Sequence, residues 1–184
     1  SIIERKSLII LLKVLSKTKN NTDFLLNVVG DGPLKKSLQE YAKKNGISEI
    51  INWRGNVSRN EVEKIISSSH LHVITSLSEG NPTTIWECMS YGIPTMTLDH
   101  CGMSDTVCDK CGIKIKLDSP KLVENQMKKQ LEKLSLNKKI LYDLNLGTKK
   151  CAENNLWTKR VKTIEKYYKI TIRNWEKSKN KYEK

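Results

Sequence analysis

Short apolar runs rich in β-branched residues alternate along this chain with longer stretches of helical periodicity. The runs predict strands over residues 24–29, 50–53, 71–75, 94–98 and 113–115. The stretches between them predict helices that begin near Pro33, Ser58, Thr84 and Ser119. Strands separated by helices in this way pair in parallel through right-handed crossovers. The sequence therefore predicts the α/β class, with a Rossmann-like parallel sheet that carries helices on both faces.

The chain changes character near its C-terminal end. Its 184 residues suit one compact domain, which we place at residues 1–155. Residues 149–184 hold twelve lysines and arginines against four acidic residues. Aromatic residues lie between these charges at Trp157, Tyr167, Tyr168 and Trp175. We expect residues 156–184 to form a basic, solvated helix whose aromatic rings pack back on the domain, with an anionic membrane surface as the alternative partner.

The net charge of +13 permits weak, salt-sensitive association with polyanions. Because the basic residues are spread over predicted helices and form no known nucleic-acid-binding module, we predict no specific nucleic-acid partner. The apolar run at residues 8–12 is far shorter than the roughly 20 residues of a membrane span. The N-terminus also lacks the features of a secretory signal. We therefore expect a cytoplasmic protein, with peripheral contact to the inner face of the membrane as a further hypothesis.

Five cysteines are too few for a disulfide scaffold, and their number is odd. A zinc site is one interpretation, because Cys108 and Cys111 have the spacing of a zinc knuckle and His100 and Cys101 could complete four ligands. However, only one such pair is present, and an adjacent histidine and cysteine are awkward ligands for one tetrahedral ion. The favoured prediction is ordinary reduced thiols and no metal site.

Three unusual segments follow predicted strands, at residues 30–33, 54–56 and 76–84. Ligands of α/β sheets bind outside the carboxyl ends of the strands, so we expect the three segments to line one crevice. Gly30 and Gly32 are a weak signal by themselves, because the third glycine of the dinucleotide-binding fingerprint is absent. A tight turn that leads into a helix is an equally good interpretation of these two glycines.

Residues 78–94 carry the most specific pattern. Glu79 follows a predicted strand, so its carboxylate can enter the crevice. The turn after it consists of Gly80, Asn81 and Pro82. Thr83 and Thr84 then offer hydroxyl and N–H groups at a helix start, which favours phosphate oxygens, and Glu87 can accept two hydrogen bonds from a ribose. The alternative is a capped helix with two surface glutamates.

This pattern resembles the signature of retaining GT-B glycosyltransferases, specifically glycosyltransferase family 4. The likeness rests on two glutamates separated by seven residues, followed by Cys-Met-Ser-Tyr-Gly-Ile-Pro at residues 88–94. Further matches lie at residues 28–33, 51–57 and 99–107, and the resemblance covers roughly residues 2–170. It implies the C-terminal, donor-binding half of a GT-B fold, without its first strand and without the N-terminal acceptor-binding domain.

The resemblance implies a role for each candidate residue. Glu79 would lie beside the donor sugar and the reacting carbon, Glu87 would hold the ribose, and Arg54 would flank the base. The residues that would line the sugar and the diphosphate are Gly80, Asn81, Pro82, Thr83 and Thr84, with Gly30 and Gly32 in the turn before the donor site. Lys6 would neutralise the diphosphate of the leaving group.

One position departs from the family pattern. The family usually has an arginine five residues before the lysine that matches Lys6, and this chain has Ser1 there. Arg5 is the candidate replacement, although on a helix its side chain would point away from that of Lys6.

The resemblance therefore implies that the protein is a retaining glycosyltransferase that takes part in surface polysaccharide or glycolipid synthesis. Its donor would be a nucleotide sugar and its acceptor a glycan or a lipid-linked sugar. The resemblance implies neither a cofactor nor a metal, and a fragment without the acceptor domain would be inactive. A nucleotide-sugar epimerase and a non-catalytic nucleotide-binding module are the alternatives.

Overall fold

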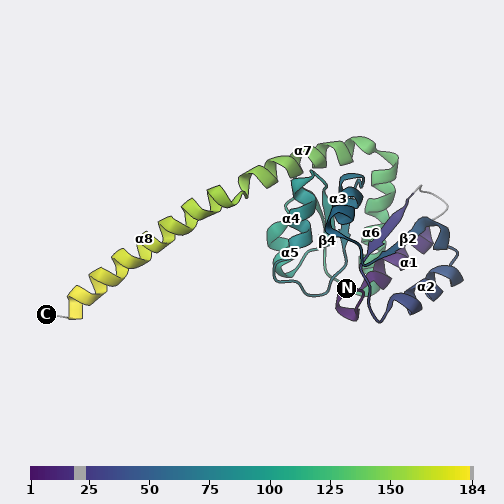
Figure 1. The fold of residues 1–184 in the computed structure, drawn as a ribbon, viewed down its shortest axis with the longest axis horizontal. Helices are drawn as coiled ribbons and strands as arrows, with labels where there is room; N and C mark the ends of the chain where they lie inside the picture. Colours follow the sequence, from purple (N-terminus) through teal and green to yellow (C-terminus); the bar gives the residue numbers. More distant parts are fainter. Residues whose placement is uncertain (19–23, 183–184) are drawn as a thin grey trace.

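Short parallel strands form the framework of the computed structural model, which describes residues 1–18 and 24–182 (Figure 1). The strands are β1 (Leu26–Val29), β2 (Ile51–Gly55), β3 (His72–Ile74), β4 (Thr95–Leu98) and β5 (Gly112–Ile115). Each overlaps a predicted strand, and the pairings β1–β2, β3–β4 and β4–β5 are parallel. In the described part of the chain the strands form two sheets, β1–β2 and β3–β4–β5, instead of the single sheet that we predicted. The α/β class is confirmed.

Helices connect the strands and flank the sheets (Figure 1). They are α1 (Leu8–Thr18), α2 (Lys35–Lys44), α3 (Arg59–Ser67), α4 (Thr83–Ser90), α5 (Cys101–Thr106), α6 (Pro120–Leu136), α7 (Lys138–Asn154) and α8 (Trp157–Tyr182). Predicted helix starts match α2, α3, α4 and α6, and the Ser58 side chain caps α3 by accepting a hydrogen bond from the Glu61 N–H. Helices α1, α5 and α7 were not predicted.

Helix α1 packs against α6 and builds much of the core. Leu12 of α1 and Met127 of α6 are almost completely buried. At the edge of this contact the Glu124 carboxylate is also buried, and Lys17 Nζ lies 2.5 Å from its Oε2. The apolar run at residues 8–12 therefore lies in a core helix, in which Leu11 and Leu12 are buried and residues 8–10 are partly buried.

The N-terminal segment lies between the ends of the two sheets. The Ile2 N–H donates to the Asp31 carbonyl after β1 at 2.9 Å, and the Leu77 N–H after β3 donates to the Arg5 carbonyl at 2.8 Å. A Cβ atom at Gly32 would lie 2.4 Å from the Ile2 carbonyl oxygen, so only glycine allows this approach. This segment brings residues 5 and 6 to the C-terminal end of β3.

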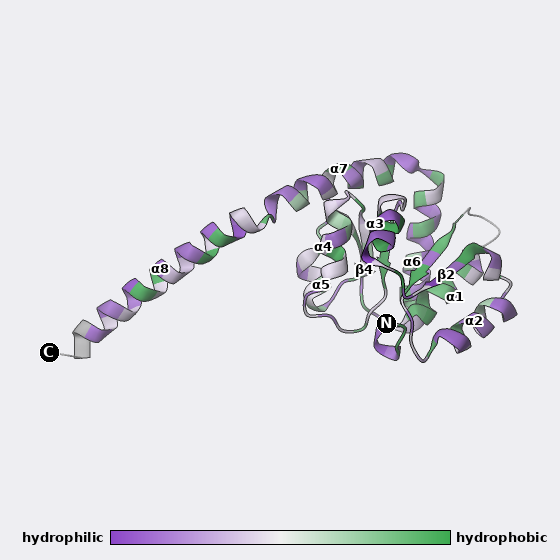
Figure 2. Ribbon diagram, viewed as in Figure 1, coloured by the Kyte–Doolittle hydropathy of each residue, from purple (hydrophilic) through white to green (hydrophobic). Residues whose placement is uncertain are grey.

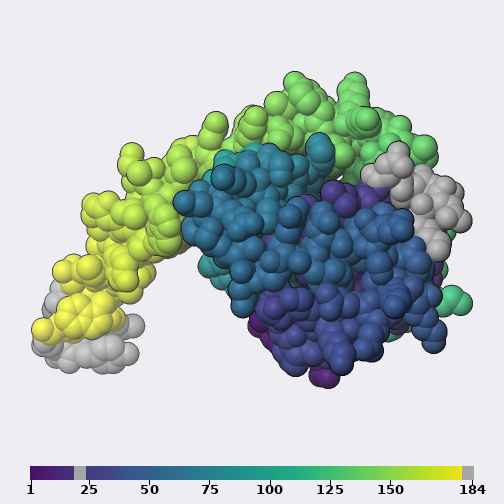
Figure 3. Space-filling model, turned by 45° about the vertical axis from the view of Figure 1, so that its right-hand side comes forward, coloured from purple at the N-terminus to yellow at the C-terminus, as the bar shows by residue number. Residues whose placement is uncertain are grey.

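Helix α8 projects away from the rest of the molecule (Figures 1 and 3). Its side chains are exposed throughout residues 157–179, with Trp157 at 73% and Trp175 at 62% of full exposure. The prediction that its aromatic rings pack back on the domain is wrong, because no described element lies along the helix to cover them. Apolar and polar residues alternate along α8 (Figure 2), and no helix among the described residues is both long and apolar enough to cross a membrane.

Candidate active site

Two cations and one carboxylate meet at the C-terminal end of β3. Lys6 Nζ donates to Glu79 Oε1, and Arg5 Nη1 lies 3.2 Å from the same oxygen. The Thr75 hydroxyl donates to the Lys6 carbonyl at 2.9 Å and so holds the segment in place. The expectation that Arg5 points away from Lys6 is wrong. Residues 4–6 form a single 3-10 turn that ends at Ser7 with a φ of 46°, and from this turn both long side chains reach the Glu79 carboxylate.

The Glu79 carboxyl remains ionised in this environment. Its side chain is 12% exposed, and burial by itself would raise its pKa. Hydrogen bonds from Lys6 and from the Ser76 side chain, together with the charges of Lys6 and Arg5, instead hold the pKa of Glu79 below its usual value. Two cations and one carboxylate leave the cluster with a net positive charge, which favours an anionic ligand.

Helix α5 fixes the loop that carries Glu79. The Gly102 N–H donates to the Glu79 carbonyl at 2.9 Å. A Cβ atom at Gly102 would lie only 1.7 Å from the Gly80 carbonyl oxygen, so this helix can approach the loop only with glycine at that position. The match to the family at residues 99–107 includes Gly102, but neither the helix nor its support of Glu79 was predicted.

The start of helix α4 lies directly after this loop. Pro82 precedes the helix in an extended conformation and provides no side-chain cap, and Thr83 and Thr84 are exposed. The first N–H groups of α4 therefore lack a side-chain cap, and the helix dipole favours an anion at this end. One turn further on, Glu87 Oε1 accepts a hydrogen bond from Arg59 Nη1 at 2.8 Å. The pattern of the sequence gave no signal for Arg59, which reaches Glu87 from α3.

The turns after β1 and β2 form a second group. The Gly30 N–H donates to the Gly55 carbonyl at 2.7 Å, and Gly30 has a φ of 112°, which favours glycine. Arg54 Nε donates to Asn27 Oδ1 at 2.9 Å. The structure thus brings Gly30, Gly32 and Arg54 together at one sheet and Glu79 to Glu87 at the other, with residues 2–6 between them.

A cavity of about 240 Å³ adjoins the Glu79 loop. It is lined by Gly80, Asn81, Trp86, Gly102, Asp105, Thr106, Asn155 and Arg160. Asn81 Oδ1 accepts a hydrogen bond from Trp86 Nε1 at 3.0 Å, and the Arg160 guanidinium lies 4.6 Å from the centre of the Trp86 ring. Of the residues predicted for the site, Gly80 and Asn81 line this cavity, and the turns at Gly30 and Arg54 do not. The wall formed by the start of α8 was not predicted.

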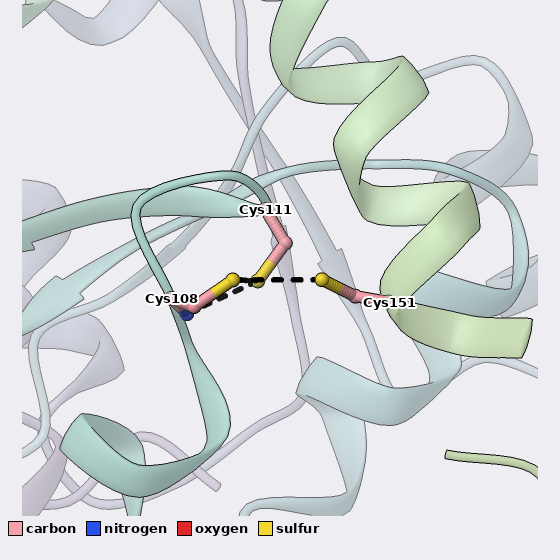
Figure 4. A group of neighbouring side chains, drawn as sticks. All are labelled: Cys108, Cys111 and Cys151. Atoms are coloured by element: carbon pink, nitrogen blue, oxygen red, sulfur yellow. Dashed lines mark hydrogen bonds between the residues drawn. The ribbon is translucent and has the colours of Figure 1, made fainter. Parts of the chain in front are cut away.

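The four candidate zinc ligands separate into two groups. His100 Nδ1 lies 3.1 Å from the Cys101 sulfur, and His100 Nε2 lies 3.3 Å from the Ser76 carbonyl oxygen. Cys108 and Cys111 instead approach Cys151 of α7 (Figure 4). The combination of His100 and Cys101 with the knuckle pair is therefore wrong as a ligand set, because residues 108–111 pack against α7.

Residues 1–144 match a protein-family model described as glycosyl transferases group 1. The chain is similar to the lipopolysaccharide 1,6-galactosyltransferase of Salmonella typhimurium, with 34% identity over 79 residues. That match covers 42% of this chain and 22% of the relative. This chain therefore corresponds to only a part of that protein.

Two solved structures show the same fold at low sequence identity. The pneumococcal O-GlcNAc transferase GtfA, in complex with UDP and GlcNAc, matches with a TM-score of 0.76 and 20% identity over 94% of this chain and 34% of that one. The C-terminal domain of the glycosyl transferase group 1 family protein LpcC from Francisella tularensis matches with a TM-score of 0.74 and 18% identity. That match covers 84% of this chain and 81% of the domain.

Proposed function

This chain belongs to the glycosyl transferases group 1 family, and on that basis we propose that it is the donor-binding part of a retaining glycosyltransferase. The enzyme would move a sugar from a nucleoside-diphosphate sugar to an acceptor. The observation that carries the proposal is the cluster of Arg5, Lys6 and Glu79 beside the uncapped start of α4. The complex of the similar GtfA structure with UDP and GlcNAc supports a donor of this class.

The positive groups of the site suit the diphosphate of the donor. Lys6 and Arg5 lie against Glu79, and the first N–H groups of α4 have no side-chain cap, so they are available to a bound anion. Negative charge grows on the leaving phosphate as its bond to the anomeric carbon breaks. Lys6 would stabilise that charge as a compact ammonium, and Arg5 would add a second positive charge, replacing the arginine that the family usually has where this chain has Ser1.

The two glutamates have different environments, which suits different tasks. Glu79 is ionised and nearly buried, so its charge can stabilise positive character at the anomeric carbon. Glu87 is held by Arg59 on the exposed side of α4 and would accept hydrogen bonds from the ribose hydroxyls. In the retaining reaction the acceptor hydroxyl attacks the anomeric carbon as the nucleoside diphosphate leaves, and the product keeps the configuration of the donor.

The acceptor is a glycan or a lipid-linked sugar in surface polysaccharide or glycolipid synthesis. The similarity to a lipopolysaccharide galactosyltransferase supports this class. A further domain, outside this chain, would bind the acceptor, since the chain covers less than half of that relative and of GtfA. Such an enzyme would act in the cytoplasm at the inner face of the membrane, and its donor site requires neither a metal nor a cofactor.

Calorimetry with UDP, GDP and ADP at millimolar concentration tests the donor site in this chain. We expect weak binding of at least one nucleotide, and Lys6→Ala should weaken it about tenfold by removing one charged contact. Lys128→Ala is the matched control, because Lys128 also pairs with a carboxylate but lies on α6. The absence of binding for all three nucleotides would contradict the proposal.

The kinetics of the complete enzyme separate the two glutamates. Glu79→Gln should lower kcat by about a hundredfold, because it removes charge where the transition state needs it. Glu87→Ala should mainly raise the KM for the donor, because the ribose contact is equal in the ground state and the transition state. Small and equal effects of both substitutions would show that the two glutamates are ordinary surface carboxylates.

A further inference from the structure

Three cysteine sulfurs meet on the side of the body where the loop between α5 and β5 contacts α7 (Figure 4). Cys108 Sγ lies 3.4 Å from Cys111 Sγ and 3.5 Å from Cys151 Sγ. All three sulfurs lie within 4.8 Å of one another. We call Cys108, Cys111 and Cys151 the three-thiol cluster. None of its members lines the cavity beside Glu79.

The spacing of the sulfurs fits a shared metal ion. Zinc–sulfur bonds of about 2.3 Å in a tetrahedral site place two sulfur ligands about 3.8 Å apart. A disulfide requires a sulfur–sulfur distance of about 2.05 Å, and it would join only two of the three sulfurs. The observed separations are closer to the first arrangement, and in that arrangement all three cysteines take part.

The loop arranges two of the sulfurs through its backbone. The Cys111 N–H donates to the Cys108 carbonyl at 2.9 Å and closes a tight turn over the two residues between them. The Cys108 N–H donates to the Cys111 sulfur at 3.1 Å. Such turns and N–H···S contacts place two thiolates on the same side of the chain, as the two-residue spacing of zinc knuckles requires.

Helix α7 brings the third sulfur to this loop by close packing. A Cβ atom at Gly147 would lie only 1.8 Å from the Lys110 carbonyl oxygen, so glycine allows the helix to touch the loop. The buried Thr148 hydroxyl lies 3.2 Å from the Cys111 carbonyl oxygen, in hydrogen-bonding contact. Residues 147, 148 and 151 share one face of α7, and therefore these contacts direct Cys151 to the other two sulfurs.

The exposure of the three cysteines shows which side of the cluster is open to solvent. Cys111 is buried, Cys151 is partly buried and Cys108 is exposed. An ion held by the three sulfurs would therefore keep one coordination position on the solvent side, where water can bind. We propose that the three-thiol cluster binds one thiophilic divalent cation of the zinc type through three thiolates.

Binding releases the protons of the thiols, and the ion then links the loop between α5 and β5 to α7. Because α7 leads directly into α8, the ion would strengthen the attachment of the projecting helix to the body.

Zinc titration of the reduced chain against a chromophoric chelator tests this site. We expect one bound ion for each chain, and Cys108→Ser or Cys151→Ser should weaken binding by about tenfold or more through the loss of one ligand. Cys101→Ser is the matched control, because Cys101 is an exposed cysteine outside the cluster. It should bind zinc as tightly as the unmodified chain.

A second measurement uses the unmodified chain and so avoids any variant that fails to fold. Zinc should protect Cys108 and Cys151 from a thiol-specific reagent, whereas Cys101, which is exposed outside the cluster, should react equally with and without zinc. Absence of zinc binding by the reduced, folded chain would overturn the proposal. So would full affinity in Cys151→Ser, or a loss of affinity in Cys101→Ser, because either result would place the ion elsewhere.

Discussion

The α/β body and helix α8 differ in where their apolar side chains lie. In the body, side chains such as Leu12 and Met127 are buried between helices and sheets. In α8, Ile164 and Trp175 are exposed, and the described chain provides no surface that covers them. The helix is supported locally instead, for example by Lys169 Nζ, which lies 2.7 Å from Glu165 Oε1 one turn away. A helix can thus form from neighbouring residues alone, whereas each strand depends on distant ones.

The two regions meet at the junction after α7. Asn155 and Arg160 help to line the cavity beside Glu79, and Arg160 stacks on Trp86. Beyond this point α8 extends into solvent (Figure 3). The comparison therefore predicts that substitutions in the body affect stability strongly, and that substitutions in α8 affect interactions with other molecules.

The largest difference is expected for matched truncations of apolar side chains. Leu12→Ala should lower the free energy of unfolding by about 3 kcal/mol, because it opens a cavity in the core. Ile164→Ala should change it by less than about 0.5 kcal/mol, because the side chain is already exposed. Urea denaturation followed by circular dichroism measures both values. Similar losses in the two variants would mean that α8 is packed against a surface in solution.

A smaller effect is expected where α7 docks on the body. In a helix Gly→Ala usually stabilises, but Gly147→Ala places a methyl group against the Lys110 carbonyl and should cost about 1–3 kcal/mol. Gly80→Ala is the control, because a Cβ atom there would meet no other atom within 4 Å. The same denaturation experiment compares the two variants. A more stable Gly147→Ala variant would contradict the close contact between α7 and the loop.

The smallest expected effect of a single substitution is on the binding of α8 to anionic membranes. Its basic residues include Lys159, Arg160, Lys162, Lys166, Lys169 and Arg173. Each lysine near an anionic bilayer contributes roughly 1 kcal/mol, so Lys166→Ala should reduce binding to anionic liposomes about fivefold, while Lys128→Ala in the body should not. Sedimentation should also decrease between low and physiological salt. Equal sedimentation with neutral and anionic vesicles, or none with either, would contradict an anionic membrane surface as the partner of α8.

Several features of the fold followed from local sequence patterns. A short apolar run predicted β3, and the stretch of helical periodicity after it predicted α4, so Glu79 was expected to follow a strand and Glu87 to lie on a helix. These assignments depend on neighbouring residues, which a single sequence displays directly. Helix α5 was not predicted, because six residues are too few to show a helical period. Its position also depends on the close contact of Gly102 with the Gly80 carbonyl, which lies far away in the sequence.

The sequence by itself determined the alternation of strands and helices, the residues at the ends of the strands and the basic character of α8. Only the tertiary structure decided which of these residues meet. Lys6 and Glu79 are 73 positions apart, and Cys108 and Cys151 are 43 apart. Such pairs form when packed helices and sheets bring distant segments together, and close approaches like that of Gly147 to Lys110 determine their geometry. Periodicity carries no information about those approaches, because it records which face of an element is buried but not what covers it.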